Sequence, residues 1–211
     1  MLFALEAPDQ AAILIAFFLL VAFPVHEFSH AFAAWRLGDD TARRAGKLTL
    51  NPISHFHPLG GLMLILSVVM IGMPFGFAAT PVNPSKLRGR HGEAIVAAAG
   101  PLSNVAMALV FGLVMRALFN SDAALGIPPR VFVLLDLIVY GNIVLGIFNV
   151  LPVPPLDGST ILLSFLPREM RWRIEPQFTQ YGMLLLLVVF LFGGQVIGPV
   201  ANAIFKVVVG Y

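Results

Sequence analysis

The sequence predicts an all-α membrane protein: a polytopic helical bundle of four to five, at most six, transmembrane helices, with a re-entrant or hairpin element after the first span. Composition is the first reason. Of 211 residues, 58% are hydrophobic and 11% are charged, whereas soluble domains average about 45–50% apolar and about 25% charged residues. The second reason is that five apolar runs approach the roughly 20 residues that a span needs. They are 11–35, 62–80, 94–119, 131–151 and 183–209.

The composition also excludes several classes of protein. A soluble globular domain needs more charged surface, and a disordered chain combines low hydrophobicity with high charge. The formal net charge of +2 argues against a nucleic-acid partner, so we expect the lipid bilayer as the surroundings. The chain has no cysteine, which excludes disulfides, thiolate metal sites and a cysteine nucleophile. Any metal must be held by histidine and carboxylate.

The first run, 11–35, is interrupted only by His26, Glu27, Ser29 and His30. A cleavable signal peptide would start with a positively charged region, but the residues before this run include two acids and no Lys or Arg. We therefore expect a retained span with its N-terminus outside.

Positive charge indicates how the second run lies, because Lys and Arg favour the cytoplasmic side. Clusters at 36–47 and 86–90 flank the run 62–80. If this run dips in and returns, ten of the 13 Lys and Arg lie inside. The segment 72–76, Gly-Met-Pro-Phe-Gly, suits such a reversal, which must be covered by protein or line a cavity. We favour four spans plus a re-entrant element; five spans are the alternative.

The later runs complete a single membrane-embedded domain over 1–211, with a catalytic core at about 11–160. A short turn with two prolines joins the runs 94–119 and 131–151. The segment 167–180 is amphipathic and polar enough to lie at the membrane interface. It precedes the last span, so that 167–209 forms a C-terminal amphipathic segment and span.

The first span contains His26-Glu27-Phe28-Ser29-His30, an H-E-x-x-H pattern. On a helix, residues i and i+4 share a face, so two imidazoles can bind one Zn²⁺ while Glu27 reaches a water at the metal. Chance should produce this pattern in on the order of one per cent of chains this long. Ionisable groups inside a span are costly and indicate function by default. The pattern therefore predicts a metal site.

Catalytic zinc usually has three protein ligands, so a third ligand must come from another segment. The remaining candidates are Glu93, Asp136 and Asp157. Asp157 follows the inner end of the run 131–151, at the depth of the two histidines. Asp136 lies near the outer end of that run, about 30 Å away if helical, and Glu93 opens a helix, where a carboxylate is favourable. Asp157 is the best placed.

Three prolines at 152, 154 and 155 cannot sit in an undisturbed helix, so the backbone opens beside the proposed metal. Asn149 lies one turn earlier, inside the apolar run. A buried amide must be satisfied. Asn149 either donates to a developing oxyanion or joins two helices by a hydrogen bond, and the sequence leaves both interpretations open.

H-E-x-x-H in one span and N-x-x-P-x-P-x-L-D-G over 149–158 in a later one resemble the site-2 protease family of intramembrane zinc metalloproteases. The segment 99–104, Ala-Gly-Pro-Leu-Ser-Asn, resembles the A-G-P-x-x-N signature of that family. The segments 47–60 and 81–84 resemble its compact members, which lack PDZ and CBS domains, although His57 stands where Asp is usual.

The resemblance implies a three-span core in the cell membrane with the active site near the cytoplasmic face. His26, His30 and Asp157 would bind one Zn²⁺ per chain, Glu27 would be the general base, and Asn149 would support the oxyanion. The implied activity is hydrolysis of peptide bonds within transmembrane segments of membrane proteins, as in regulated intramembrane proteolysis. The implied partner is a substrate's transmembrane helix.

Two rival functions use the same ligands. A membrane metal transporter, or another non-proteolytic metal-binding protein, needs polar groups in both halves of the membrane, and here they gather on one side. An inactive scaffold would not need Glu27.

Elsewhere, we interpret His55 and His57 as polar residues of an interfacial loop, with a metal site as the alternative. Gly100 and Asn104 resemble a small-residue packing face, with a substrate contact for Asn104.

Overall fold

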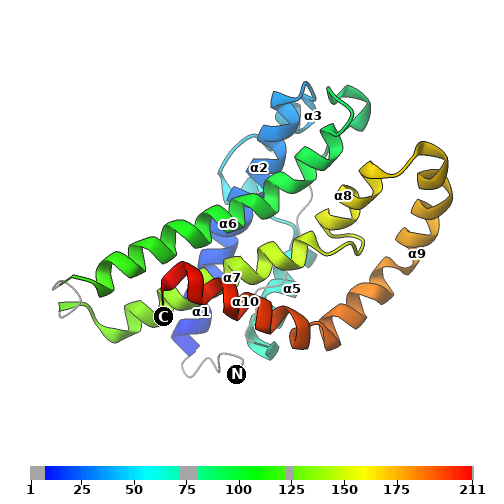
Figure 1. Cartoon of the computed structure of the whole chain (residues 1–211). Helices are drawn as coiled ribbons and strands as arrows, with labels where there is room; N and C mark the ends of the chain where they lie inside the picture. Colours follow the sequence, from blue (N-terminus) through cyan, green and yellow to red (C-terminus); the bar gives the residue numbers. More distant parts are fainter. Residues whose placement is uncertain (1–7, 72–79, 122–125, 211) are drawn as a thin grey trace.

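The computed structural model describes residues 8–71, 80–121 and 126–210, and every element within these ranges is helical (Figure 1). The elements are α1 (Pro8–Phe17), the π-helix η1 (Phe18–Ala22), α2 (Phe23–Arg36), α3 (Thr41–Arg44), α4 (Pro52–His55), α5 (Pro58–Ile71), the 3₁₀-helix η2 (Pro84–Lys86), α6 (Gly92–Phe119), α7 (Pro129–Val150), α8 (Asp157–Phe165), α9 (Arg168–Phe192) and α10 (Gly194–Val209). The predicted all-α bundle is confirmed.

Within the described ranges, three helical stretches are long and apolar enough to cross a membrane. They are 10–36, which joins α1, η1 and α2, and the helices α6 and α7, and they match the predicted runs closely. The pair α9 and α10 forms a fourth candidate span, bent by 70°. Helix α9 joins the predicted amphipathic segment to the last apolar run without a break. The bend between α9 and α10 lies at Gly193 and Gly194, a usual place for a kink.

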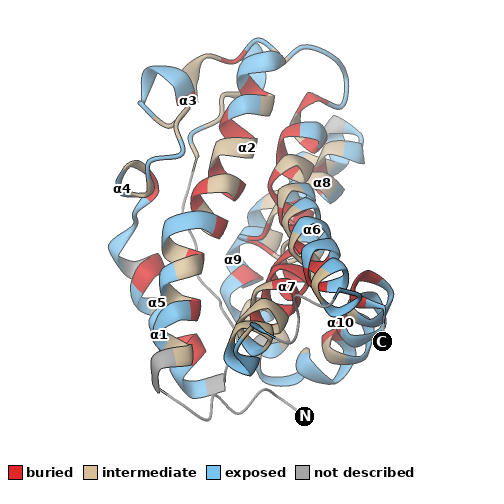
Figure 2. Cartoon of the chain, turned by 90° about the vertical axis from the view of Figure 1, so that its left-hand side faces the viewer, coloured by how far each residue is buried: buried red, intermediate tan, exposed pale blue. Residues whose placement is uncertain are grey.

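Helix α7 forms the centre of the bundle, and buried residues concentrate on it (Figure 2). In its most apolar stretch 56% of the residues are buried, whereas the corresponding share is 33% in 10–36 and 39% in α6. One apolar cluster joins α7 to α6 and α10, and a second joins it to α1, η1 and α5. Many large apolar side chains of α6 and α9 are exposed instead. Such an extended apolar exterior marks a surface that contacts lipid or protein.

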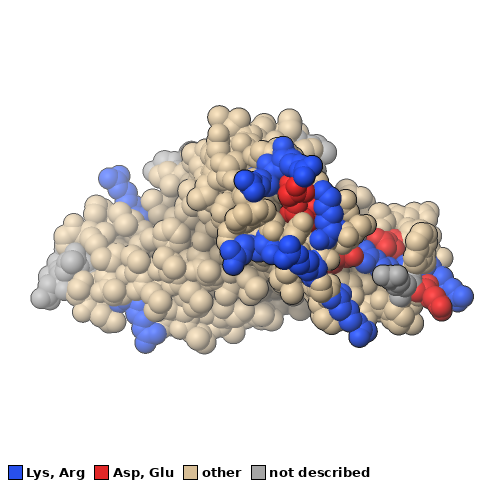
Figure 3. Space-filling model, turned by 90° about the horizontal axis from the view of Figure 1, so that it is seen from above, with Lys and Arg blue, Asp and Glu red and all other residues tan. Residues whose placement is uncertain are grey.

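The two flanks of α5 lie at the same end of the molecule. The backbone N–H of Asn83 donates to Asp39 Oδ2 over 2.6 Å, and the backbone N–H of Arg88 donates to the Leu37 carbonyl over 2.8 Å. Seen from this end, Lys and Arg side chains gather on one face (Figure 3). This arrangement agrees with an element that enters and returns on one side. The predicted reversal at 72–76 lies outside the described residues.

Asp39 is the central acceptor of this contact between the flanks and is fully buried. Burial by itself would raise the pKa of its carboxyl group. Hydrogen bonds from Thr41 and from the Asn83 backbone, together with the charge of Lys86, outweigh that effect and lower the pKa below its usual value of 3.8. The carboxylate therefore stabilises the contact in its ionised form.

Candidate metal centre

Helix α2 carries His26, Glu27 and His30, and all three are buried. The i, i+4 spacing places the two imidazoles on one face, as predicted. Their ring centroids lie 4.7 Å apart and their Nε2 atoms 3.1 Å apart. One turn of π-helix, η1, precedes α2; such turns often accompany functional sites, and the apolar sequence of η1 did not reveal it.

Asp157 is the first residue of α8. Helix α7 ends at Val150, just before the three prolines, as predicted, and the chain turns through 151–156 before α8 begins. A Cβ at Gly158 would overlap the carbonyl groups of Val150 and Leu151. Glycine at 158 therefore allows α8 to begin against the end of α7, which places the neighbouring Asp157 beside α2.

The three predicted ligands meet at one point. Asp157 Oδ2 lies 3.2 Å from His26 Nε2 and 3.3 Å from His30 Nε2. Together with the 3.1 Å between the two nitrogens, these atoms form a nearly equilateral triangle. Ligand atoms around a tetrahedral Zn²⁺, with bonds of about 2.0–2.1 Å, lie about 3.3 Å apart. The triangle therefore has the dimensions of one face of a zinc tetrahedron.

The hydrogen bonds of the two imidazoles also favour a cation site. His30 Nδ1 lies 2.7 Å from the Val96 carbonyl oxygen, and His26 Nδ1 lies 2.7 Å from Asn104 Oδ1. Both oxygens only accept hydrogen bonds, so each Nδ1 carries a hydrogen, and in the neutral imidazole each Nε2 then presents its lone pair. Asp157 Oδ2 is buried, and no donor within the described ranges satisfies it. With both imidazoles neutral, three electron pairs face one another, an arrangement that suits a cation between them.

Gly100 of α6 provides the space for this group. A Cβ added at position 100 would lie 2.5 Å from His26 Nε2 and would overlap His30 Nε2. Any side chain there would fill the region on which the ring nitrogens converge. The small-residue pattern predicted a packing face for Gly100, and the structure places Gly100 against the candidate metal ligands.

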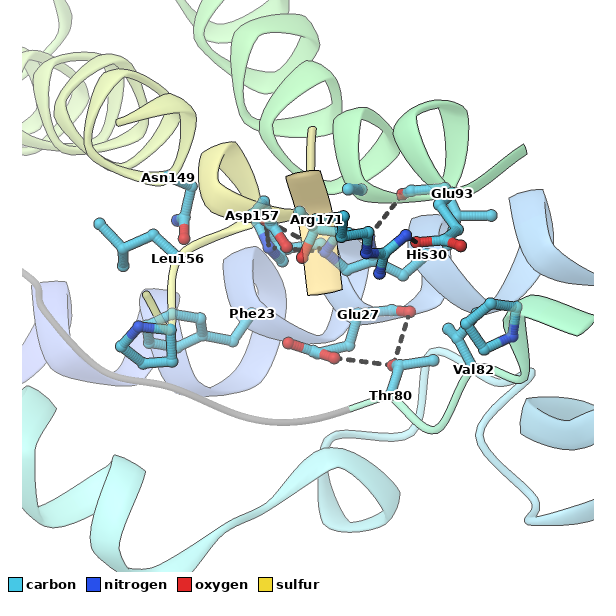
Figure 4. Close-up of a pocket in the computed structure, with 16 residues that line it drawn as sticks. Phe23, Glu27, His30, Thr80, Val82, Glu93, Asn149, Leu156, Asp157 and Arg171 are labelled. Carbon is cyan, nitrogen blue, oxygen red and sulfur yellow. Dashed lines mark hydrogen bonds and ion pairs between the residues drawn. The ribbon is translucent and has the colours of Figure 1, made fainter. Parts of the chain in front are cut away.

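A cavity of about 440 Å³ opens beside the triangle (Figure 4). It is lined by α2, α6, the end of α7, the turn before α8, α8, α9 and the segment that begins at Thr80. Glu27 lies in its wall, and the Thr80 hydroxyl donates to Glu27 Oε2 over 2.7 Å. No local sequence pattern points to Thr80, because 53 residues separate it from Glu27.

The other candidate carboxylates have different surroundings. Glu93 opens α6, as predicted, and lines the cavity, but it pairs with Arg171 of α9 over 2.7 Å. Within the described ranges the group that could hold a metal consists of His26, His30 and Asp157; Glu93 and Asp136 are not part of it.

The polar residues left open by the sequence also have defined partners. Asn149 lines the cavity, and its amide donates to the Leu145 carbonyl over 3.0 Å; this bond uses one of its two N–H hydrogens. His55 is the last residue of the short helix α4, is buried and lies 2.7 Å from the Thr49 carbonyl oxygen. Asn104 is fully buried, so the suggested substrate contact at Asn104 is wrong.

Comparisons with known proteins place the chain in a family. The model of peptidase family M50 matches residues 122–193. The candidate zinc metalloprotease YwhC of Bacillus subtilis is 35% identical over 191 residues, which cover 88% of this chain and 84% of that protein. The candidate zinc metalloprotease Rip2 of Mycobacterium tuberculosis is 35% identical over 178 residues, or 82% of this chain and 64% of Rip2. No solved structure matches.

The match to YwhC extends over most of both chains, and the family model covers the segment that carries Asn149 and Asp157. The apolar helices agree with a multi-pass membrane protein. The chain therefore belongs to peptidase family M50, the site-2 protease family of zinc metalloproteases, and is a metallopeptidase.

Proposed function

We propose that the chain is an intramembrane zinc metalloprotease that hydrolyses peptide bonds within transmembrane segments of membrane proteins, and that it acts in regulated intramembrane proteolysis. The observation that carries this proposal is the triangle of His26, His30 and Asp157, with sides of 3.1–3.3 Å. Its two histidines belong to a helical stretch, 10–36, that is long and apolar enough to span a bilayer.

His26, His30 and Asp157 would hold one Zn²⁺ per chain. When bound, Zn²⁺ supplies a Lewis acid that polarises a carbonyl group and lowers the pKa of water to about 7. The Nδ1–H groups, held by Asn104 and by the Val96 carbonyl, aim both Nε2 atoms at the site, and Gly100 keeps the space between α2 and α6 open. These features suit a neutral-imidazole metal site.

Glu27 is the proposed general base. Its carboxylate follows a proposed ligand in the sequence, lies in the cavity wall and is held at Oε2 by the Thr80 hydroxyl. It takes a proton from the attacking water and passes it to the leaving nitrogen. Asn149 is the proposed hydrogen-bond donor to the oxyanion. One hydrogen of its amide is donated to the Leu145 carbonyl, and the second can be donated to the oxyanion.

The proposed substrate is a transmembrane helix that opens locally. In a bilayer, a helix satisfies its backbone groups internally, so its carbonyl groups are inaccessible until the helix unwinds. The cavity beside the triangle is lined by both apolar and polar residues, including Val82, Leu156 and Thr160, which suits a short unwound segment. The lipid bilayer is the expected medium.

We place the protein in the cell membrane with the active site near the cytoplasmic face. The basic segments 36–47 and 86–90 lie at one end of the molecule, joined by the contacts of Asp39 and Arg88. Helix α2 ends at Arg36, less than two turns after His30. The positive-inside rule then puts the site close to the cytoplasm.

The test compares the wild type with Glu27→Gln, and with Glu175→Gln as a matched control. Glu175 is a carboxylate of α9 that does not line the cavity. Each purified protein is assayed for zinc content and for cleavage of a model membrane protein in lipid vesicles. We expect one zinc in all three and loss of cleavage in Glu27→Gln alone.

Unchanged cleavage by Glu27→Gln contradicts the mechanism. Zinc retained at full stoichiometry by a His26→Ala/Asp157→Ala double variant contradicts the ligand assignment. Zinc binding by a wild type that cuts no membrane substrate favours a non-proteolytic metal-binding role.

A further inference from the structure

A chain of buried amides continues inward from His26. His26 Nδ1 lies 2.7 Å from Asn104 Oδ1, Asn104 Nδ2 donates to Asn142 Oδ1 over 3.1 Å, and Asn142 Nδ2 donates to the Ile138 carbonyl over 2.9 Å. Both asparagine residues are 0% exposed. The chain connects α2 to α6 and α6 to α7, and it ends on a backbone group that cannot rotate.

The direction of every hydrogen bond follows from that fixed end. The Ile138 carbonyl only accepts, so Asn142 must turn its NH₂ group toward it and its oxygen toward Asn104. Asn104 must then donate to Asn142 and present its own oxygen to His26. If either amide flipped, two donors or two acceptors would face each other in a buried region, at a cost of about 1–3 kcal/mol per unsatisfied group. His26 is therefore held with its hydrogen on Nδ1.

We infer that Asn104 and Asn142 are positioning residues for the metal centre, and that Asn142 acts on His26 through Asn104. The inference rests on the zinc ligation proposed above. The relay fixes which nitrogen of His26 faces Asp157 and how the ring is turned. Nothing in the sequence pattern assigns this role to Asn142, which lies inside α7 and 15 residues before Asp157 in the sequence.

The two histidines are held by different means. His30 is held by the main-chain carbonyl of Val96, so side-chain substitutions in α6 leave its acceptor in place. His26 depends on two side chains and on the packing of α6 against α7. The relay thus couples the geometry of the candidate metal site to the central helix of the bundle, and its contribution can be removed by substitution.

The test is a double-mutant cycle with Asn104→Leu, Asn142→Leu and the double variant. Zinc affinity is measured by competition with a chelator in detergent at fixed pH. Loss of a group that orients a metal-binding histidine typically lowers metal affinity by about 10–100-fold, and we expect this loss in each single variant. Because Asn142 acts through Asn104, the double variant should bind no more weakly than Asn104→Leu alone.

Val139→Ala is the matched control. Val139 is fully buried in α7, one turn before Asn142, and belongs to the apolar cluster between α6, α7 and α10. This change should lower the Tm by creating a cavity and leave zinc affinity unchanged. Wild-type zinc affinity in Asn142→Leu overturns the inference, and so do losses that add in the double variant.

A measurement on the wild type avoids dependence on the folding of the variants. In ¹⁵N-histidine-labelled protein, NMR distinguishes a protonated ring nitrogen from a bare one. We expect His26 to carry its hydrogen on Nδ1 both before and after zinc is added. A His26 without a hydrogen on Nδ1 in the metal-free protein refutes the relay even if the wild type binds zinc. Absence of zinc binding with the hydrogen on Nδ1 refutes the proposed metal function and leaves the relay standing.

Discussion

Replacing Gly100 by alanine should greatly weaken zinc binding, although it adds only one methyl group. Ordinary contacts of a Cβ begin at 3.4 Å, whereas a Cβ at position 100 would lie 2.5 Å from His26 Nε2. The helices α2 and α6 would have to separate by the difference, about 0.9 Å, or the imidazoles would have to turn away. Metal–ligand distances tolerate changes of about 0.2 Å, so the triangle cannot survive this displacement.

We expect Gly100→Ala to weaken zinc binding by at least about 100-fold, or about 2.7 kcal/mol. Turnover at saturating zinc should fall by a similar factor, because a misplacement of 1 Å costs about 10² in rate. The assay is chelator competition for zinc, followed by cleavage of a membrane substrate in vesicles. The rate is expressed per bound zinc.

Gly112→Ala provides the control within the same helix. Its Cβ would overlap the side chain of Val208 at the contact between α6 and α10, about 18 Å along the helix from Gly100. It should lower the Tm and leave zinc affinity unchanged. If Gly100→Ala binds zinc as tightly as the wild type, the site is not where the triangle lies.

Three further predictions test other parts of the molecule. Asn149→Ala should lower kcat by on the order of 10²–10³ with zinc content unchanged if the second amide hydrogen serves the oxyanion; normal turnover per zinc with a lower Tm would show a structural role. Cysteines introduced by Ala45→Cys and Arg88→Cys, in a chain without native cysteine, should both react with an impermeant thiol reagent from the same side of sealed vesicles; labelling from opposite sides would restore five spans. Because the pKa of Asp39 is lowered below 3.8, its ionised form stabilises the fold above that pH, and this contribution is lost as the pH falls through the lowered pKa. The Tm difference between the wild type and Asp39→Asn should therefore be largest near neutral pH and shrink below about pH 4; a constant difference would contradict this assignment.

Much of the fold follows from local sequence. Runs of apolar residues long enough to span a bilayer predict helices, because backbone groups in lipid must be satisfied within the segment. The runs 11–35, 94–119 and 131–151 therefore correspond closely to the observed helices. The prolines from 152 to 155 end α7 for an equally local reason, since proline lacks the N–H that a helix needs. The bend at Gly193 was missed, because one apolar run can be one helix or two.

Part of the site is also local. The spacing of His26 and His30 on one helix needs no knowledge of the rest of the chain, and this pair by itself indicates a metal. The third metal ligand, in contrast, cannot be identified from local spacing. Glu93, Asp136 and Asp157 are all carboxylates near apolar runs, and the position of Asp157 beside α2 depends on how closely α8 begins against α7 at Gly158.

The helical class, the approximate spans and the pair of histidines can be predicted from the amino-acid sequence, because each depends on periodicity or composition within about 30 residues. The groups that surround this pair are known only from the folded chain. Gly100 approaches both imidazoles, Thr80 holds Glu27, and Asn142 reaches His26 through Asn104. These partners are separated by 38 to 78 residues or lie on different helices. Contacts of this kind depend on the packing of whole helices against one another, which no short pattern in the sequence specifies.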